Sequence, residues 1–275
     1  MPCAVLLDNF RRARKISGFD FFRMEALTEF FNSPAQMAAM FVCALFIGMS
    51  KTGVQGITMI SVPVMALTFG AKESTGVILP MLCFADILAV LYYRHSVQWR
   101  YVFALLPAAV VGLFAALPAD RVVPREFFGH LMGFCILVGL VAMVWSEIKK
   151  PDSDAVSHKW WYAAFFGVLG GFTTMIGNAA GGVMAVYLLS MRMKKLAFVG
   201  TNAWFFLVIN YTKIPLQVFA WNNISAQTLL LDAVSIPFIV AGAVFGVWFV
   251  KKLPERAYRI FVIVSTFLST LLMFF

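Results

Sequence analysis

Long apolar segments follow one another along almost the whole chain, and they restrict its fold more than any other feature. The sequence is 61% hydrophobic and 13% charged, whereas soluble domains are about 45–50% apolar and about 25% charged. So large an excess of apolar residues cannot be buried in the core of one soluble domain. The apolar segments are 35–47, 57–69, 75–93, 101–117, 127–146, 160–172, 179–190, 197–221, 224–250 and 257–275. A membrane-spanning helix needs about 20 residues, and most of these segments approach that length. We therefore predict an all-α polytopic membrane protein.

Four of these segments are too short to cross a bilayer alone, and they form two pairs, each joined by a glycine-rich break. The first break is GMSKTGVQG at 48–56, and the second is GFTTMIGNAAGG at 171–182. Each pair is expected to be either one discontinuous helix or a re-entrant hairpin. Non-helical backbone at membrane depth is tolerated only where protein buries it or where it lines a wet cavity. The breaks are therefore expected to lie inside the protein, where paired interruptions mark a substrate site.

The order of landmarks after each break indicates an internal repeat. Gly76 and Asp86 are matched by Gly200 and Asn210 at a constant offset, and three further positions recur at a slightly larger offset: Pro107, Gly112 and Pro124 are matched by Pro237, Gly242 and Pro254. The predicted architecture is two halves, expected to be inverted repeats, each with a broken or re-entrant helix pair followed by three transmembrane helices. Its boundaries are an amphipathic N-terminal arm at 1–34, a first repeat at 35–146, a polar linker at 147–159 and a second repeat at 160–275.

The distribution of basic residues favours two re-entrant pairs. In that arrangement one side of the membrane carries Lys72, Arg121 and Arg125, whereas the other carries Arg94, Arg100, Lys149, Lys150, Lys159, Arg192, Lys194, Lys195, Lys251, Lys252 and Arg256. Cytoplasmic loops usually hold the excess of Lys and Arg, which also explains the net charge of +9 without a nucleic acid partner. The basic residues of the arm would then face outside, and they would face inside if the first pair crosses as one discontinuous helix. Both alternatives stay open for the first pair.

Polar residues within the two breaks suit a small anion. The first break contains Ser50, Lys51, Thr52 and Gly53, and the second contains Thr173, Thr174, Gly177 and Asn178. Free N–H groups at the start of a helix carry partial positive charge, hydroxyl and amide groups donate hydrogen bonds, and Lys51 adds a full charge. The alternative is that the glycines only allow close helix packing. Because donors and a charge accompany the glycines, the pattern favours a substrate-binding site.

Ionisable residues inside the apolar segments are few, and each is a functional candidate because a charge at this depth is costly. Asp86 lies near the middle of 75–93, and we expect it to carry a coupling proton. The alternative is that Asp86 is a structural partner for Lys51 or Lys213. Asp232 is a weaker candidate, because it lies near the start of its segment and has no counterpart in the other half.

A polar stripe follows one face of segment 197–221. It consists of Asn202, Asn210, Lys213 and Gln217, at spacings close to one side of a helix. Such a face lines a pathway or packs against a polar neighbour. Lys213 could instead extend to a lipid headgroup, since it lies toward the end of the segment.

The chain from the first break onward resembles the TauE/SafE sulfite exporter family, also called the toluene sulfonate uptake permeases. In the first half the resemblance lies in G-x-S-K-T-G, a following Val-Pro, G-x-x-x-P leading into Ala-Asp, Y-x-R-x-x-V-x-W, and Leu-Leu-Pro ending in Gly. The second half is similar, more loosely, through GGFTTMIGNAAGG and FVGTNAWFFLVINYTKIP. The resemblance covers about 36–275 and gives the arm no counterpart. It implies a bacterial inner-membrane carrier of sulfur-containing or small organic anions, driven by the proton gradient, with site residues Ser50, Lys51, Thr52, Gly53, Asp86 and Asn210.

The sequence thus predicts a secondary transporter, expected to be proton-coupled, for a sulfur oxyanion or organosulfonate such as sulfite or sulfoacetate. The anion is expected to lie between the two breaks, with protonation of Asp86 biasing the side to which the cavity opens. The alternatives are an anion channel and a carrier of a small carboxylate. An enzyme is not expected, because no metal-ligand spacing and no Ser/His pair at matched depth is present. No cofactor or metal is expected, and the expected partners are the anion, protons and the bilayer.

Overall fold

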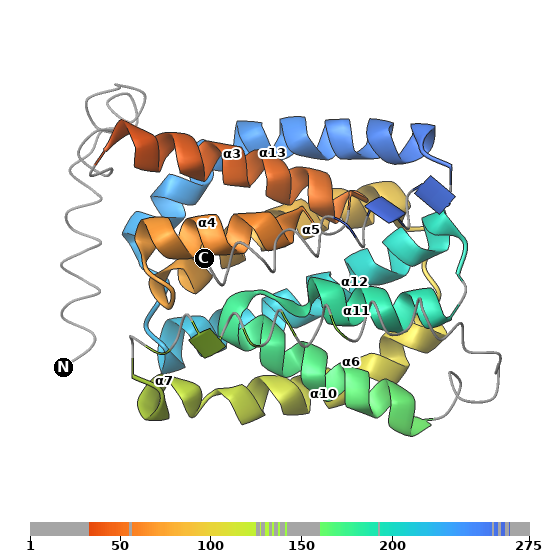
Figure 1. The fold of residues 1–275 in the computed structure, drawn as a ribbon, viewed down its shortest axis with the longest axis horizontal. Helices are drawn as coiled ribbons and strands as arrows, with labels where there is room; N and C mark the ends of the chain where they lie inside the picture. The colour runs from red at the N-terminus through yellow and green to blue at the C-terminus, as the bar shows by residue number, and fades with distance from the viewer. Residues whose placement is uncertain are drawn as a thin grey trace.

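The computed structural model describes residues 33–54, 57–124, 160–191 and 193–254, with isolated positions between 127 and 141 and between 256 and 264. These residues are almost entirely helical (Figure 1). The helices are α3 (Pro34–Lys51), α4 (Thr58–Phe69), α5 (Glu73–Tyr93), α6 (Trp99–Ala116), α7 (Ala119–Val122), α10 (Trp160–Gly177), α11 (Ala180–Ser190), α12 (Lys195–Pro215), the π-helical turn η2 (Leu216–Ala220) and α13 (Ala226–Lys252). Almost all of the predicted arm at 1–34, and the linker at 147–159, lie outside the described residues.

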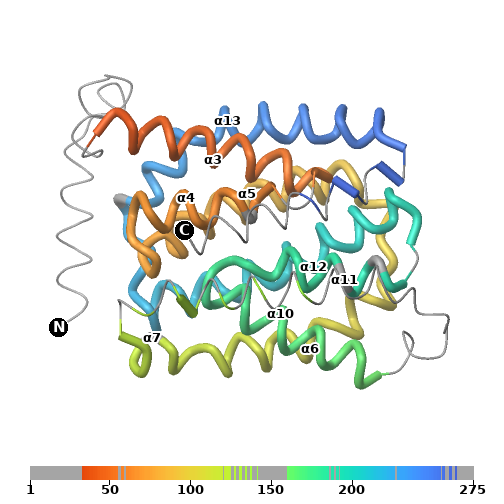
Figure 2. The backbone as a smooth tube through the Cα atoms, in the orientation of Figure 1, coloured from red at the N-terminus to blue at the C-terminus, as the bar shows by residue number. Residues whose placement is uncertain are grey.

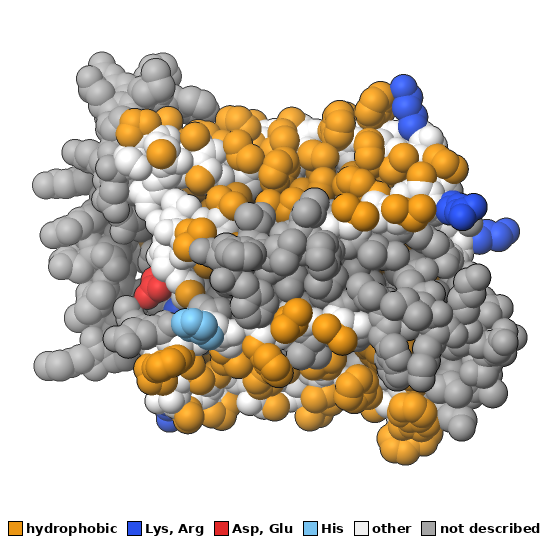
Figure 3. Space-filling model, in the orientation of Figure 1, with side chains coloured by type: hydrophobic (Ala, Val, Ile, Leu, Met, Phe, Trp, Pro, Cys, Tyr) orange, Lys and Arg blue, Asp and Glu red, His pale blue; other side chains and the backbone are white. Residues whose placement is uncertain are grey.

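Five of the described helices are long and apolar enough to cross a membrane: α3, α5, α6, α12 together with η2, and α13. Figure 3 shows hydrophobic side chains spread over the outer face of the bundle, whereas the visible Lys and Arg side chains lie at its ends. This distribution is the one expected for a surface in contact with lipid. The prediction of an all-α fold with several membrane-spanning helices is confirmed.

The two short helix pairs are hairpins. At the start of α3, Gln36 Nε2 donates a hydrogen bond of 3.1 Å to the carbonyl oxygen of Thr68 at the end of α4. In the second pair, Tyr162 near the start of α10 stacks on Tyr187 near the end of α11, with ring centroids 5.8 Å apart. Figure 2 shows the two hairpins entering the bundle from opposite ends. Both pairs therefore fold back on themselves, and a single discontinuous helix does not describe the first. Whether each hairpin is re-entrant in the membrane stays a prediction.

The interruptions are shorter than the glycine pattern predicts. Helix α3 continues through Lys51, and α10 continues through Gly177, so that the second break is confined to Asn178 and Ala179. Gly53 and Asn178 have positive φ angles of 137° and 55°. Residues other than Gly rarely have a positive φ angle. A positive φ at each break marks the point where the preceding helix stops.

Glycines bring α3 and α13 into backbone contact. A Cβ atom placed at Gly48 would lie 2.1 Å from the carbonyl oxygen of Ile239, and one at Gly242 would lie 2.0 Å from that of Leu45. Both distances are far below van der Waals contact, so only glycine allows the two helices to approach this closely.

The same arrangement joins α6 and α10. A Cβ atom at Gly112 would lie 2.1 Å from the carbonyl oxygen of Val168, and one at Gly171 would lie 1.9 Å from that of Ala109. The packing alternative is thus correct for Gly48 and Gly171, which belong to helices and not to the interruptions themselves.

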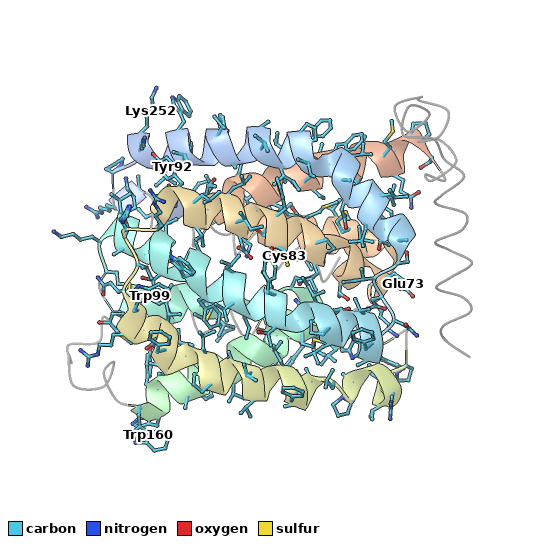
Figure 4. All side chains as sticks on the ribbon, turned by 180° about the vertical axis from the view of Figure 1, so that it is seen from behind. Glu73, Cys83, Tyr92, Trp99, Trp160 and Lys252 are labelled. Atoms are coloured by element: carbon cyan, nitrogen blue, oxygen red, sulfur yellow. The ribbon has the colours of Figure 1, made fainter. Side chains whose placement is uncertain are left out.

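Helices α5 and α12 run antiparallel through the centre of the bundle. Figure 4 shows Glu73 and Tyr92 at opposite ends of α5, with Cys83 between them. Gly76 near the start of α5 meets Asn223 beyond the end of α12, and Gly200 near the start of α12 meets Tyr93 at the end of α5. This central pair places the middle of each helix next to the ends of the two hairpins.

Candidate functional site

The two breaks face one cavity inside the bundle. Its walls come from the ends of α3 and α10, the starts of α4 and α11, and one face each of α5 and α12, and they consist of Ser50, Lys51, Thr58, Leu82, Thr174, Asn178, Gly181, Asn202, Phe206 and Asn210. The centre of a water-sized molecule can occupy about 40 Å³ of this cavity, whereas one water needs about 10–15 Å³ on such a measure. The space therefore holds a few waters or one small polyatomic ion.

Lys51 and Asp86 form a buried ion pair at the edge of the cavity. Lys51 Nζ lies 2.8 Å from Asp86 Oδ1 and 4.0 Å from the ring centroid of Phe206. Asn210 Nδ2 donates a hydrogen bond of 2.7 Å to the other carboxylate oxygen, Asp86 Oδ2. A buried ion pair is sustained only when good geometry and further hydrogen bonds offset desolvation. Lys51 lines the cavity and Asp86 does not, so the carboxylate contacts the lysine on the side away from the cavity.

Lys213 is fully buried on α12 and reaches the second break. Its Nζ donates a hydrogen bond of 2.7 Å to the carbonyl oxygen of Thr174, contacts Thr174 Oγ1 at 3.4 Å, and donates to Asn178 Oδ1. Within the described part of the chain, all of its hydrogen-bond acceptors are neutral oxygens. The alternative in which this side chain extends to a lipid headgroup is wrong, because its amino group points into the protein.

Asn178 is held in its left-handed conformation by partners on two other helices. Its Oδ1 accepts from Lys213 of α12, and its Nδ2 donates a hydrogen bond of 3.2 Å to the carbonyl oxygen of Thr75 in α5. A residue other than Gly in this region of backbone space costs about 1–3 kcal/mol and persists only where its surroundings fix it. The second break is therefore fixed by contacts with α5 and α12 and is not a frayed helix end.

Several polar atoms of the cavity wall lack a hydrogen-bond partner among the described residues: Thr58 Oγ1, Asn202 Oδ1 and Asn210 Oδ1. Buried polar groups are nearly always hydrogen-bonded, so these atoms mark positions where water or a polar ligand binds. A Cβ atom at Gly181 would meet nothing within 4 Å, which shows that the start of α11 opens onto free space. No group of three or more His, Cys, Asp or Glu side chains in the described ranges is placed to hold a metal ion.

The structure brings part of the predicted site together. The predicted residues that line the cavity are Ser50, Lys51, Thr174, Asn178, Asn202 and Asn210. Asp86 and Lys213 lie behind the wall and contact lining residues. Their roles in binding or coupling stay predictions.

The remaining predicted residues lie outside the lining. Thr52 Oγ1 donates a hydrogen bond of 2.9 Å to the carbonyl oxygen of Ala243, and Thr173 Oγ1 donates one of 3.2 Å to that of Gly170. Gly53 packs against Val250, and Gly177 ends α10. These contacts give Thr52 and Thr173 packing roles, and a part for them in substrate binding is still a prediction.

Four lining residues were not predicted: Thr58, Leu82, Gly181 and Phe206. Thr58 and Gly181 lie at the start of the helices that follow the breaks. Their positions next to the breaks could therefore have identified them as lining residues. Leu82 lies four residues before Asp86, and Phe206 lies four residues before Asn210, so each shares a helix face with a polar residue. Apolar side chains in a chain this apolar have no distinguishing mark, and only the spacing could have indicated these two.

A family profile described as Sulfite exporter TauE/SafE matches residues 40–273, which include both breaks and the central helices α5 and α12. No curated protein and no solved structure matches the chain. The profile match extends over nearly the whole sequence, so the chain belongs to the TauE/SafE sulfite exporter family.

Proposed function

We propose that this protein is a secondary transporter that carries a small sulfur oxyanion or organosulfonate across the bacterial inner membrane. The observation that carries the proposal is the convergence of two helix breaks and Lys51 on one buried cavity. Broken helices that meet near the centre of a bundle are the usual substrate site of secondary transporters. Family membership supports the sulfur-anion class.

The cavity wall supplies the groups that an oxyanion needs. Lys51 contributes an ammonium group, Ser50, Thr58 and Thr174 contribute hydroxyl groups, and α4 and α11 begin beside the cavity. The first N–H groups of a helix have no partner within the helix and carry partial positive charge. Together these donors replace the water that an anion loses on entering the protein.

We further propose that α3–α6 and α10–α13 are inverted repeats. In support, α3 packs on α13 as α10 packs on α6, and the glycine contacts at both interfaces use matched positions. Gly48 and Gly171 occupy the same place in their hairpins, as Gly112 and Gly242 do in the helices that these hairpins meet. Halves of this kind can exchange conformations, which opens the central site first to one side and then to the other.

The two ends of the central helix pair are candidates for the gates. A Cβ atom at Gly76 would lie 2.2 Å from the carbonyl oxygen of Asn223, whereas one at Gly200 would lie 3.1 Å from that of Tyr93. The two contacts are related by the proposed repeat and differ in tightness. We propose that the gate at the Gly76 end is closed more firmly in this conformation than the gate at the Gly200 end, because its contact is tighter.

Asp86 is the group to which we assign proton coupling. It is buried between α5 and α12, and it is paired with a lysine that lines the cavity. A change in its protonation would therefore alter both the charge of the site and the contact between the two central helices.

The test is sulfite flux into proteoliposomes. Lys51→Ala should abolish flux, and Asp86→Asn should make flux insensitive to a pH gradient. Lys252→Ala is the matched control, because Lys252 is exposed at the end of α13, and it should leave flux unchanged. Wild-type flux in both Lys51→Ala and Asp86→Asn would refute the proposal, and linear, non-saturating flux with unitary currents would replace it with an anion channel.

A further inference from the structure

The buried charges around the cavity do not balance. Lys51 is paired with Asp86, whereas the ammonium group of Lys213 has only neutral oxygen acceptors in the described part of the chain. With all three groups ionised, two lysines and one aspartate leave a net charge of +1. An uncompensated charge is costly in a buried site, so the site is built to receive one negative charge.

Other titratable groups near Asp86 do not change this sum. The titratable side chains on the helices around Asp86 are Lys51 on α3, Tyr211 and Lys213 on α12, Asp232 on α13, and Cys83 on α5, the helix of Asp86 itself. Helix α4 has no titratable side chain, and the tyrosine of α10, Tyr162, lies near its far end. Asp232 is buried, and neither of its carboxyl oxygens bonds to a described residue. Nothing described stabilises its charged form, in contrast to the three oxygen acceptors of Lys213, so we count Asp232 as neutral.

We propose that the site binds a monoanion while Asp86 is ionised and binds a dianion only together with one proton on Asp86. The inference rests on the proposed function and specifies the valence of its substrate. A monoanion neutralises the cluster as it stands. A dianion would leave a net charge of −1, and uptake of one proton by the carboxylate of Asp86 restores neutrality without any bond forming to the substrate.

The geometry around Asp86 provides the means for this exchange. Proton uptake removes the carboxylate charge that holds Lys51, whose Nζ already lies beside the cavity. Asn210 now donates to Asp86 through Nδ2, while its Oδ1 has no partner among the described residues. If the amide of Asn210 turns over, Oδ1 accepts the new proton of Asp86 and Nδ2 becomes a donor toward the cavity. One proton thus gives the dianion both a freed ammonium group and an additional N–H donor.

A consequence is that the bound cargo carries the same net charge in both cases. Sulfite exists near neutral pH as a monoanion and as a dianion. In this scheme the site takes up the first as it is and the second with a proton, so each transport cycle moves one negative charge regardless of which form binds.

Isothermal titration calorimetry of the full chain in detergent tests the proposal, with thiosulfate and methanesulfonate as probes. The two ions are nearly isosteric, since a methyl group replaces the terminal sulfur, and each keeps one charge state between pH 5 and 8, thiosulfate as the dianion. Titration in two buffers of different ionisation enthalpy gives the number of protons taken up on binding. We expect about one proton for thiosulfate and none for methanesulfonate, and a thiosulfate affinity that falls by up to about tenfold per pH unit as pH rises.

Two asparagine variants locate the proton. Asp86→Asn should bind thiosulfate without proton uptake, whereas Asp232→Asn removes another buried carboxyl group of the same helix bundle and should leave the uptake at about one. Equal uptake with both anions in the wild type would overturn the inference, even if Asp86→Asn does not fold, and so would uptake that persists in Asp86→Asn. Binding of neither anion to the wild type would instead refute the proposed function itself.

Discussion

Removal of Lys51 alone should be far more harmful to stability than removal of the whole ion pair. In Lys51→Met the carboxylate of Asp86 stays buried with Asn210 as its remaining hydrogen-bond donor in the described part of the chain. Breaking one side of a buried ion pair typically costs about 3–5 kcal/mol, because the other charge is left uncompensated. At about 2 °C per kcal/mol for a chain of this size, the expected fall in the melting temperature is about 6–10 °C.

The double variant Lys51→Met/Asp86→Asn should recover much of that loss. An asparagine at position 86 keeps a hydrogen bond with Asn210 and removes the carboxylate charge that Lys51→Met alone leaves unpaired. Asp86→Asn alone should be milder than Lys51→Met, since the ammonium group of Lys51 borders the cavity and can be hydrated there. Thermal unfolding of the purified proteins in one detergent gives all four values of the cycle. Losses that add within about 0.5 kcal/mol would show that the ion pair is not the interaction described here.

Three further substitutions probe the cavity and the breaks. Gly181→Leu should abolish flux with little loss of stability, because a side chain there enters free space, and thiosulfate titration together with a melting curve separates the two effects. Gly171→Ala should cost about 1–3 kcal/mol by overpacking, since its Cβ would lie 1.9 Å from a backbone oxygen. In Gly170→Ala the nearest atom to the new Cβ is Met184 Sδ at 3.4 Å, so this variant should melt near the wild type. Asn178→Ala should be less stable than Asn178→Gly, because both lose the side-chain hydrogen bonds and only alanine is strained at a φ of 55°; equal melting temperatures would contradict this.

The polar half of the cavity could be predicted from the sequence, because polar residues are rare in so apolar a chain. Lys51, Asn202 and Asn210 stand out against their neighbours, and all of them line the cavity. The exact ends of the helices could not be predicted from glycine content. Glycine serves equally to end a helix, as Gly53 does, and to let another helix approach, as Gly171 does. Which of the two applies depends on what packs against the position, and a single sequence does not contain that information.

The difference between the two halves is more informative than their likeness. In the proposed repeat, matching Gly48 with Gly171 pairs Lys51 with Thr174, and matching Gly76 with Gly200 pairs Asp86 with Asn210 and Ala89 with Lys213. Each break still receives one lysine: the first break holds its own, and the second is reached from α12. Among the described residues, only the first of these lysines forms an ion pair with a carboxylate.

A site with Asp at both central positions would be neutral, and one with Asn at both would carry a fixed charge of +2. The observed combination leaves one positive charge that a single proton can raise to two. In the proposed repeat, the fold that the two halves share supplies the shape of the cavity, and the positions at which they differ supply its charge. A transporter of this family with Asn in both central positions should accordingly bind dianions without proton uptake, which is the behaviour expected here of Asp86→Asn.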